Sequence, residues 1–288
     1  MNTASSSHMS TTGTFKLLPI TSEETLQRCK ECAQAPLCLI ASYPKSGTTW
    51  MQAIVASILL DGTIDGHISD FSPFFEADAT WTNCVTFAGN HSKMGVAAYN
   101  THLLPDMVPS HDGVKIVYVM RSGRDVAMSF YHHLKNQLGD GGDFVGDLEA
   151  FLSQWGTEHL PYGAWTDHVN LWVDASRQPD RAGQILLVRY EDLVADLTGS
   201  LVQVAEFLGK KLPLERASEL ASKLTFSSMK ADLDRYQPTS VKWRDGFSFL
   251  RKGESGTSFT EAEEQLFQCR VVSMAGEKIG TLREFKLI

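Results

Sequence analysis

The segment ASYPKSGTTW at positions 41–50 gathers residue types that bind an anion. A glycine lets backbone N–H groups approach a ligand closely, hydroxyls donate hydrogen bonds, and a lysine adds a mobile positive charge. An apolar run precedes the segment and helical spacing follows it, so the amides of a helix start would add their dipole. The residues concerned are Lys45, Ser46, Gly47, Thr48 and Thr49.

The order of these residues differs from that of an ATP- or GTP-binding loop. Such a loop reads G-x-x-x-x-G-K-[ST], with the lysine after the last glycine and a hydroxyl ready for Mg²⁺. Here Lys45 precedes Gly47, and no glycine stands five residues before Gly47. The segment predicts an anion site of another kind, with an ordinary strand-to-helix turn as the alternative.

Three further reactive side chains stand at the ends of apolar runs. Arg121 follows VKIVYVM, Tyr190 ends QILLVRY, and His102 follows VAAYNT. Ligands of open α/β sheets bind at the carboxyl ends of strands, so we expect these side chains to share one rim with Lys45. An imidazole titrates near neutral pH and can accept a proton in a reaction. A lone histidine is more often a packing or surface residue, which remains the alternative for His102.

The elements that must position these residues alternate between strand and helix. Short apolar, β-branched runs predict strands, and amphipathic stretches after each of them predict helices. This alternation indicates an α/β fold: one domain with a central parallel β-sheet flanked by helices on both faces. The predicted strands cover 37–42, 114–120 and 184–189; the predicted helices cover 22–34, a segment that stops at Asp61-Gly62, one capped by Ser122, one marked by Trp165, Val169 and Trp172, and one that ends at Gly209.

Two segments depart from this alternation. Residues 1–14 are polar and lack an apolar signal core, so we expect a disordered tail or an expression remnant, which leaves 15–288 as the domain. Residues 238–258 are rich in glycine, serine and basic side chains. A loop of that length inside a compact domain is usually functional or disordered, and we favour a functional role.

Composition excludes several classes of function. The 288 residues carry a net charge of −8, which disfavours a nucleic-acid surface because phosphate binding needs a basic excess. The longest strongly apolar segment, AIVASILL at 53–60, is too short to span a bilayer. Five cysteines in a sparse pattern indicate free thiols and a cytoplasmic location, and the CKEC pair at 29–32 has no second pair to complete a metal site.

The motifs together resemble those of the cytosolic sulfotransferases, which use 3′-phosphoadenosine 5′-phosphosulfate (PAPS). The matching segments follow the family's order and approximate spacing over roughly residues 37–256: YPKSGTTW, THLLP, VYVMRSGRDVAMSFYHH, VRYEDL, LTFSSMK and FLRKG. The resemblance implies a divergent member with the family's P-loop-like fold. It also implies PAPS as co-substrate, 3′-phosphoadenosine 5′-phosphate (PAP) as product, a small-molecule acceptor, and no metal.

The resemblance implies a role for each matching residue. Lys45 would contact the oxygen that bridges phosphate and sulfate, residues 46–49 would hold the 5′-phosphate, and His102 would be the catalytic base. The adenine would lie between Trp50 and Phe226, with Tyr190 beside it. The 3′-phosphate would be held by Arg121, Ser129, Arg251, Lys252 and Gly253.

The acceptor side is less defined. The segment FSPFFEADATW occupies the place of an acceptor-pocket loop in the family, so Phe74 and Phe75 are candidates for an apolar wall, with a core role as the alternative. His132 is a further candidate for the acceptor pocket, as is its neighbour His133, although both could instead face solvent. Asn100 stands where many small-molecule sulfotransferases have a lysine, which removes one cation from near the sulfate. The family's dimer signature is not recognisable, which leaves the oligomeric state open.

Two other functions remain as alternatives. A P-loop-type small-molecule or nucleotide kinase would need a Mg²⁺-binding acid after an apolar strand, and the position of Lys45 argues against it. A non-catalytic nucleotide-binding relative of the sulfotransferases gains support from Asn100, whereas the presence of both Lys45 and His102 argues against it.

Overall fold

The computed structural model describes residues 8–10, 13–82, 85–138, 144–239, 241–251 and 256–288. Its centre is a four-stranded sheet in the order β4-β3-β5-β7, and every neighbouring pair is parallel. This agrees with the α/β fold predicted from the sequence. The strands are β3 (Leu37–Ser42), β4 (Ala97–Thr101), β5 (Val114–Met120) and β7 (Ile185–Arg189).

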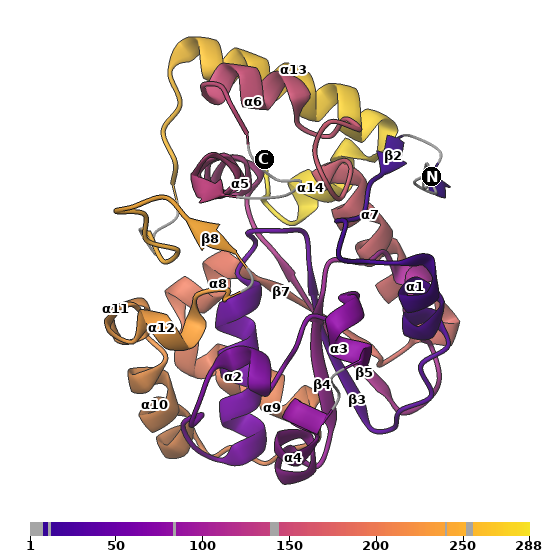
Figure 1. The fold of residues 1–288 in the computed structure, drawn as a ribbon, viewed down its shortest axis with the longest axis vertical. Helices are drawn as coiled ribbons and strands as arrows, with labels where there is room; N and C mark the ends of the chain where they lie inside the picture. The colour runs from indigo at the N-terminus through magenta and orange to yellow at the C-terminus, as the bar shows by residue number, and fades with distance from the viewer. Residues whose placement is uncertain (1–7, 11–12, 83–84, 139–143, 240, 252–255) are drawn as a thin grey trace.

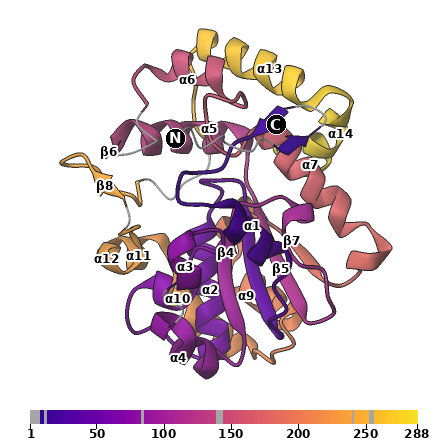
Figure 2. The same ribbon diagram turned by 45° about the vertical axis from the view of Figure 1, so that its right-hand side comes forward.

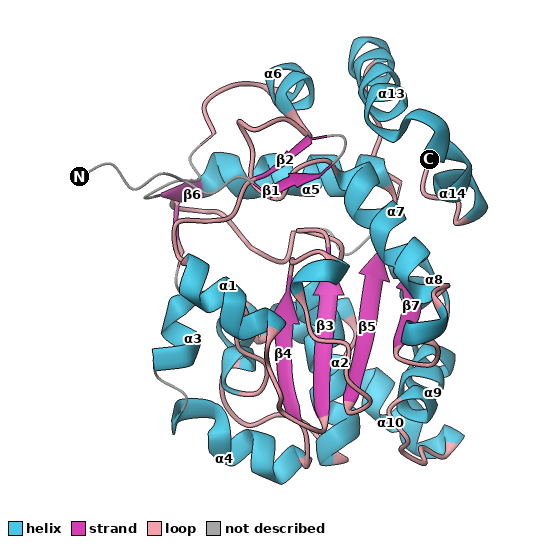
Figure 3. Cartoon of the chain, turned by 90° about the vertical axis from the view of Figure 1, so that its right-hand side faces the viewer, coloured by secondary structure: helices cyan, strands magenta, loops and turns pink. Residues whose placement is uncertain are grey.

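The strand register brings the predicted reactive residues to one edge. Ala41 pairs with Thr101, Ser42 with Val119, and Met120 with Arg189. All four strands therefore end at nearly the same level. The residues that follow them, including His102 and Arg121, lie at the same edge of the sheet. Figure 3 shows the four strands pointing the same way, toward a layer that contains α5 (Gly123–Asn136) and α6 (Leu148–Gln154).

Side chains alternate between two hydrophobic clusters, one on each face of the sheet. Leu37 and Leu39 face one cluster, whereas Cys38 and Ile40 face the other, and all four side chains are fully buried. This is the pattern of a strand covered on both faces. The second cluster includes side chains of α2 (Thr48–Leu60), α9 (Leu197–Phe207) and α10 (Leu214–Lys223), which lie together in Figure 1.

The first cluster extends from the sheet into the layer over its carboxyl edge. Trp155 stacks on Trp165 and on Phe267, which joins the turn after α6 to two other helices. Figure 2 labels the helices of this cluster and layer: α1 (Glu23–Lys30), α7 (Trp165–Ser176), α13 (Glu261–Ala275) and α14 (Ile279–Glu284). The strand β2 (Gly13–Phe15) pairs antiparallel with β1 (His8–Ser10).

Most predicted elements are observed, β4 is an additional strand, β7 begins one residue later than predicted, and two of the predicted helices differ. The helix expected over 22–34 is shorter, because α1 ends at Lys30. The single helix expected before Gly209 is two helices, α8 (Tyr190–Ala195) and α9, because Asp196 leaves helical geometry and its side chain caps α9 by accepting from the Gly199 N–H.

Residues 238–258, the late segment, lie partly beside the end of α5. Lys242–Trp243 is a short strand, β8, that pairs antiparallel with β6 (Gln137–Leu138) at the end of α5. Residues 252–255 lie outside the described residues. The remaining helices are α3 (Asp78–Thr82), α4 (Val85–Met94), α11 (Phe226–Ala231) and α12 (Leu233–Tyr236), together with 3-10 turns at 68–70, 105–107, 179–181 and 276–278.

Candidate active site

The loop between β3 and α2, which we call the anion loop, has hydrogen-bond donors without described partners at the carboxyl edge of the sheet. Gly47 has a left-handed backbone, φ 107°, and is the N-cap of α2, where no described side chain caps the first-turn N–H groups. Ser46 is 1% exposed, and its hydroxyl has no hydrogen-bond partner among the described residues. Free amides at a helix start and a buried hydroxyl in need of a partner fit the oxygens of a bound phosphate.

The Tyr190 ring packs against the backbone of this loop at Gly47. A Cβ atom added at Gly47 would lie 2.6 Å from Tyr190 Cδ2, so glycine allows the ring to approach the backbone. The Trp50 ring meets Tyr190 edge-on at 5.4 Å, and Trp50 Nε1 donates to the Leu224 carbonyl oxygen at 2.8 Å. Phe226 is half-buried at the start of α11, two residues after Leu224.

Lys45 is held in an enclosed, largely apolar setting. Its backbone is also left-handed, φ 69°. Its Nζ atom lies 3.2 Å from His133 Nδ1 and 3.9 Å from the centre of the Phe249 ring. Burial, reinforced by the nearby charge of Arg121, lowers the pKa of Lys45 to about 7. A lysine in this state gains strongly from an anion that restores its charge.

One guanidinium group approaches the loop, and a second interacts with it electrostatically. Arg121 lies 4.1 Å above the Tyr190 ring centre and donates to the Lys45 carbonyl oxygen at 3.4 Å. Burial and the charge of Arg121 lower the pKa of Arg251. Two cations this close favour an anion between them. Ser129 lies two turns further along α5, and Lys252 and Gly253 lie outside the described residues.

Asp125 attaches the late segment to the start of α5. Its carboxylate, 2% exposed, accepts from the Thr257 backbone N–H at 2.9 Å, from the Thr257 hydroxyl at 2.6 Å and from the Gly256 N–H at 3.3 Å. It also lies 3.9 Å from Arg121 Nε. One buried acid therefore connects the strand-end arginine with the segment that carries Arg251.

His102 follows β4 and points toward the loop after β3. Its Nδ1 lies 2.7 Å from the Ser42 carbonyl oxygen. A carbonyl only accepts, so Nδ1 carries the proton and Nε2 keeps a lone pair. Burial lowers the pKa of His102 to about 4, and the charge of Lys45 contributes in the same direction. The imidazole is therefore neutral at physiological pH, as a general base must be.

The candidate acceptor residues divide into two groups. The Phe74 ring lies 5.6 Å from the His102 ring, and His133 contacts Lys45. Phe75 is instead fully buried against Trp81, and His132 packs on Tyr131, the residue before it. The structure thus brings Phe74 and His133 to the reactive groups, and places Phe75 in the core.

Two residues have positions that the sequence alone did not reveal. Asn100 donates to the Ser72 carbonyl oxygen at 2.7 Å, and its backbone exchanges hydrogen bonds with Pro73 and Phe75, so it fixes the segment that carries Phe74. Glu76 is fully buried and accepts from the His102 backbone N–H at 2.7 Å. No spacing rule links residues 26 positions apart in the chain.

Among the described residues, no group of three or more histidine, cysteine, aspartate or glutamate side chains is arranged to bind a metal ion. Every helix in that part of the chain is too short or too polar to cross a membrane.

Comparison with known proteins identifies relatives in sequence. The family model described as "Sulfotransferase domain" matches residues 36–268. Sulfotransferase 2B1 of Mus musculus is 32% identical over 240 residues, which cover 79% of this chain and 68% of that protein. Sulfotransferase 1A1 of Bos taurus is 28% identical over 264 residues, covering 84% of each chain.

Solved structures share the fold. Mouse sulfotransferase SULT7A1 complexed with PAP superposes with a TM-score of 0.66 at 24% identity, covering 97% of this chain and 98% of that one. Retinol dehydratase in complex with androsterone and the inactive cofactor PAP gives a TM-score of 0.69 at 21% identity, covering 88% and 85% of the two chains.

Proposed function

Because the chain belongs to the sulfotransferase domain family, we propose that it transfers a sulfuryl group from PAPS to a hydroxyl or amine of a small-molecule acceptor. The observation that carries the proposal is the neutral, Nδ1-protonated imidazole of His102 beside the anion loop of Lys45. We further propose that residues 15–288 act as one domain. Free thiols at Cys29, Cys32, Cys38 and Cys269 support a cytoplasmic location.

The residues present fit a doubly phosphorylated adenosine. The orphan Ser46 hydroxyl and the uncapped start of α2 would hold a 5′-phosphate, with Thr48 and Thr49 in the first turn. Arg121 and Arg251, with Ser129, would hold a 3′-phosphate. Trp50, Tyr190 and Phe226 supply aromatic faces for a purine. Lys252 and Gly253 belong to the proposal through the family resemblance alone.

The mechanism follows from the chemistry of two side chains. PAPS supplies, when bound, an activated sulfuryl group with phosphate as its leaving group. His102 Nε2 accepts the proton of the acceptor as its oxygen or nitrogen attacks. The Lys45 ammonium neutralises the charge that develops on the leaving oxygen, and the amides at the start of α2 stabilise the anionic oxygens around it.

The walls around His102 and Lys45 favour an acceptor without a positive charge. Phe74 and Tyr162 flank the His102 ring at 5.6 and 5.1 Å, and Phe249 lies against Lys45. The carboxyl of Glu76 is turned to the backbone of His102 and is fully buried. Among the described residues, a cationic amine would therefore meet Lys45 without a carboxylate to offset the repulsion.

A ligand-binding series tests the donor. We expect PAP to raise the melting temperature of the protein without added metal, because the site holds its own cations. Stabilisation by Mg-ATP alone would support a kinase instead. Binding of PAP without transfer of labelled sulfate to any member of a broad panel of alcohols, phenols and amines would support a non-catalytic binding protein.

A further inference from the structure

We propose that Glu76 and His168 are positioning residues that hold the backbone of His102 from both sides, so that its imidazole presents Nε2 to the acceptor. The inference rests on the proposed function, in which His102 accepts a proton. It assigns roles to two buried side chains that do not touch the donor site.

Glu76 fixes the N–H side of residue 102. Its Oε1 accepts the His102 N–H at 2.7 Å, and its side chain has no exposed surface. Its Oε2 has no hydrogen-bond partner in the described part of the chain. Burial raises the pKa of Glu76 to about 7. A buried carboxyl is costly to keep, and this one accepts a hydrogen bond from the residue proposed as base.

His168 fixes the carbonyl side of residue 102. Its Nε2 lies 3.0 Å from the His102 carbonyl oxygen, so Nε2 must carry the proton and donate. Its Nδ1 is then an acceptor, and the Tyr118 hydroxyl lies 2.9 Å from it. Burial lowers the pKa of His168 to about 3, which keeps this ring neutral, and its two hydrogen bonds fix the tautomer.

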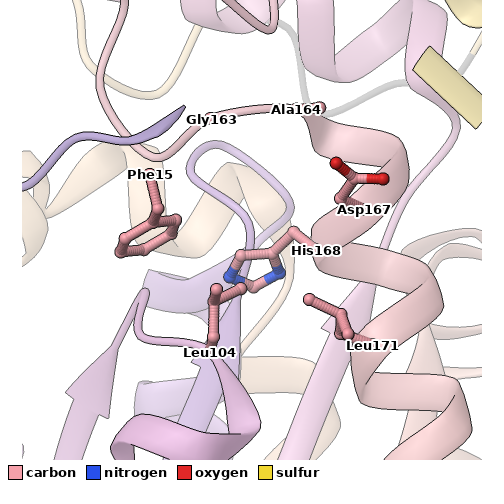
Figure 4. A pocket seen from close by; sticks show the side chains of 7 residues that line it. All are labelled: Phe15, Leu104, Gly163, Ala164, Asp167, His168 and Leu171. Carbon is pink, nitrogen blue, oxygen red and sulfur yellow. The ribbon is translucent and has the colours of Figure 1, made fainter. Parts of the chain in front are cut away.

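The His168 ring is itself held firmly. It stacks on Tyr118 at 5.7 Å and meets Tyr43 edge-on at 5.6 Å. Figure 4 shows the ring projecting from α7 toward Leu104, at a small cavity whose lining also includes Leu171. Packing therefore fixes the position of the His168 Nε2–H group that donates to the His102 carbonyl oxygen.

Three elements thus determine where His102 lies. The segment after Phe74, which bridges to Asn100 of β4, supplies Glu76; α7 supplies His168, and the end of β3 supplies the Ser42 carbonyl for ring Nδ1. With the backbone held at both its N–H and its carbonyl, a single ring hydrogen bond is enough to orient Nε2. A displacement of about 1 Å at a reacting group can cost on the order of 100-fold in rate.

The test compares shape-conserving variants that remove or keep each hydrogen bond. Glu76→Met removes the acceptor and His168→Leu removes the donor, whereas Glu76→Gln and His168→Gln each keep an amide atom able to replace it. Leu171→Ala is the packing control, because it enlarges the same cavity without touching residue 102. We expect kcat to fall about 10- to 100-fold in the Met and Leu variants, with the Kd for PAP unchanged.

Two further results make the test specific. Both Gln variants should recover most of kcat, and Leu171→Ala should retain it. In ¹⁵N NMR of the PAP-free protein, the His102 signal should show Nδ1–H in the wild type and lose this single tautomer in Glu76→Met and His168→Leu. The His102 signal is assigned by its absence in His102→Gln.

The inference is overturned if the Gln variants lose as much activity as Glu76→Met and His168→Leu, or if the latter two retain the wild-type kcat. It is also overturned if the His102 tautomer does not depend on either residue. Because the NMR measurement needs no turnover, a wild-type protein without sulfuryl transfer would refute the proposed function while the positioning of His102 is judged separately.

Discussion

Lys45 Nζ and His133 Nδ1 lie 3.2 Å apart, although the two residues are 88 positions apart in the chain. Burial lowers the pKa of both side chains, and in His133 the charge of Lys45 contributes in the same direction. Two basic groups in one enclosed space cannot both hold an extra proton, so the pair is poised to take up positive charge when an anion arrives.

The first prediction concerns proton uptake on binding PAP. Lys45 has a pKa of about 7 in the ligand-free protein, so at pH 8 most molecules carry a neutral lysine. A bound phosphate favours the charged form, and binding at pH 8 should take up roughly 0.5 to 1 proton. Titration calorimetry in two buffers of different ionisation enthalpy measures this number. It should fall toward zero in Lys45→Met, and identical heats in both buffers for the wild type would contradict the prediction.

The second prediction concerns the pH dependence of turnover. The base must be neutral to act, and the pKa of His102 is lowered to about 4. Activity that depends on it is therefore present above that pH and is lost as the pH falls through about 4, not through the ordinary value near 6.5. A kcat/KM profile from pH 4 to 8 tests this. An acid limb centred near 6.5 would show that the imidazole is more exposed in solution.

Replacement of the base gives the matching control. His102→Asn should lower kcat by about 10²- to 10⁴-fold, because it removes proton transfer. The Kd for PAP should stay within about twofold, since no described phosphate-site residue depends on the imidazole. A variant with near-normal kcat would remove His102 from the mechanism.

The third prediction concerns Asp125, which joins α5 to the late segment. By charge alone, Asp125→Asn should strengthen binding of PAP, because it removes a carboxylate 3.9 Å from Arg121 Nε. Loss of the hydrogen bonds to Thr257 acts the other way, since that segment carries Arg251. We expect the tether to dominate, with PAP dissociating about tenfold faster in stopped-flow fluorescence.

A neighbouring ion pair provides the control for Asp125. Glu264 pairs with Arg124, one residue away from Asp125 on α5, and both side chains are about one-third exposed. Glu264→Gln removes a carboxylate of similar position without releasing the Thr257 contacts. It should leave dissociation of PAP unchanged, and slower dissociation in Asp125→Asn would show that charge outweighs the tether.

Local signals in the sequence predicted much of the fold. Strands β3 and β5 have the expected bounds, because short apolar runs between turn residues leave few choices. Ser122 caps α5, accepting from the Asp125 N–H, as its position before the helical stretch indicated. The break at Asp196 was not predicted, although a capping residue inside an otherwise helical run is a local signal for it.

The site contained relationships that no local signal carries. Phe74 and Phe75 are adjacent in sequence, yet the parallel bridge of Phe74 with Asn100 determines that Phe74 meets His102 and Phe75 enters the core. A shift of one residue would exchange them. On α5, His133 contacts Lys45 whereas His132 packs on Tyr131, because the helix turns by about 100° per residue. Tertiary register, and not residue type, decides which of two neighbours reaches the candidate site.

The fourth prediction uses Gly47, where conformation and contact coincide. Gly47→Ala places a side chain at φ 107°, and its Cβ would lie 2.6 Å from Tyr190 Cδ2. The backbone strain costs about 1–3 kcal/mol, and the clash displaces either the ring or the amides of the anion loop. We expect a lower melting temperature and at least about tenfold weaker binding of PAP by calorimetry.

The control variant is Gly183→Ala, which shares a positive φ of 71° but meets no atom within 4 Å. It should lose stability and keep its affinity for PAP, because strain without the clash leaves the loop in place. Wild-type affinity in Gly47→Ala would show that the approach of Tyr190 to the loop is not required for binding.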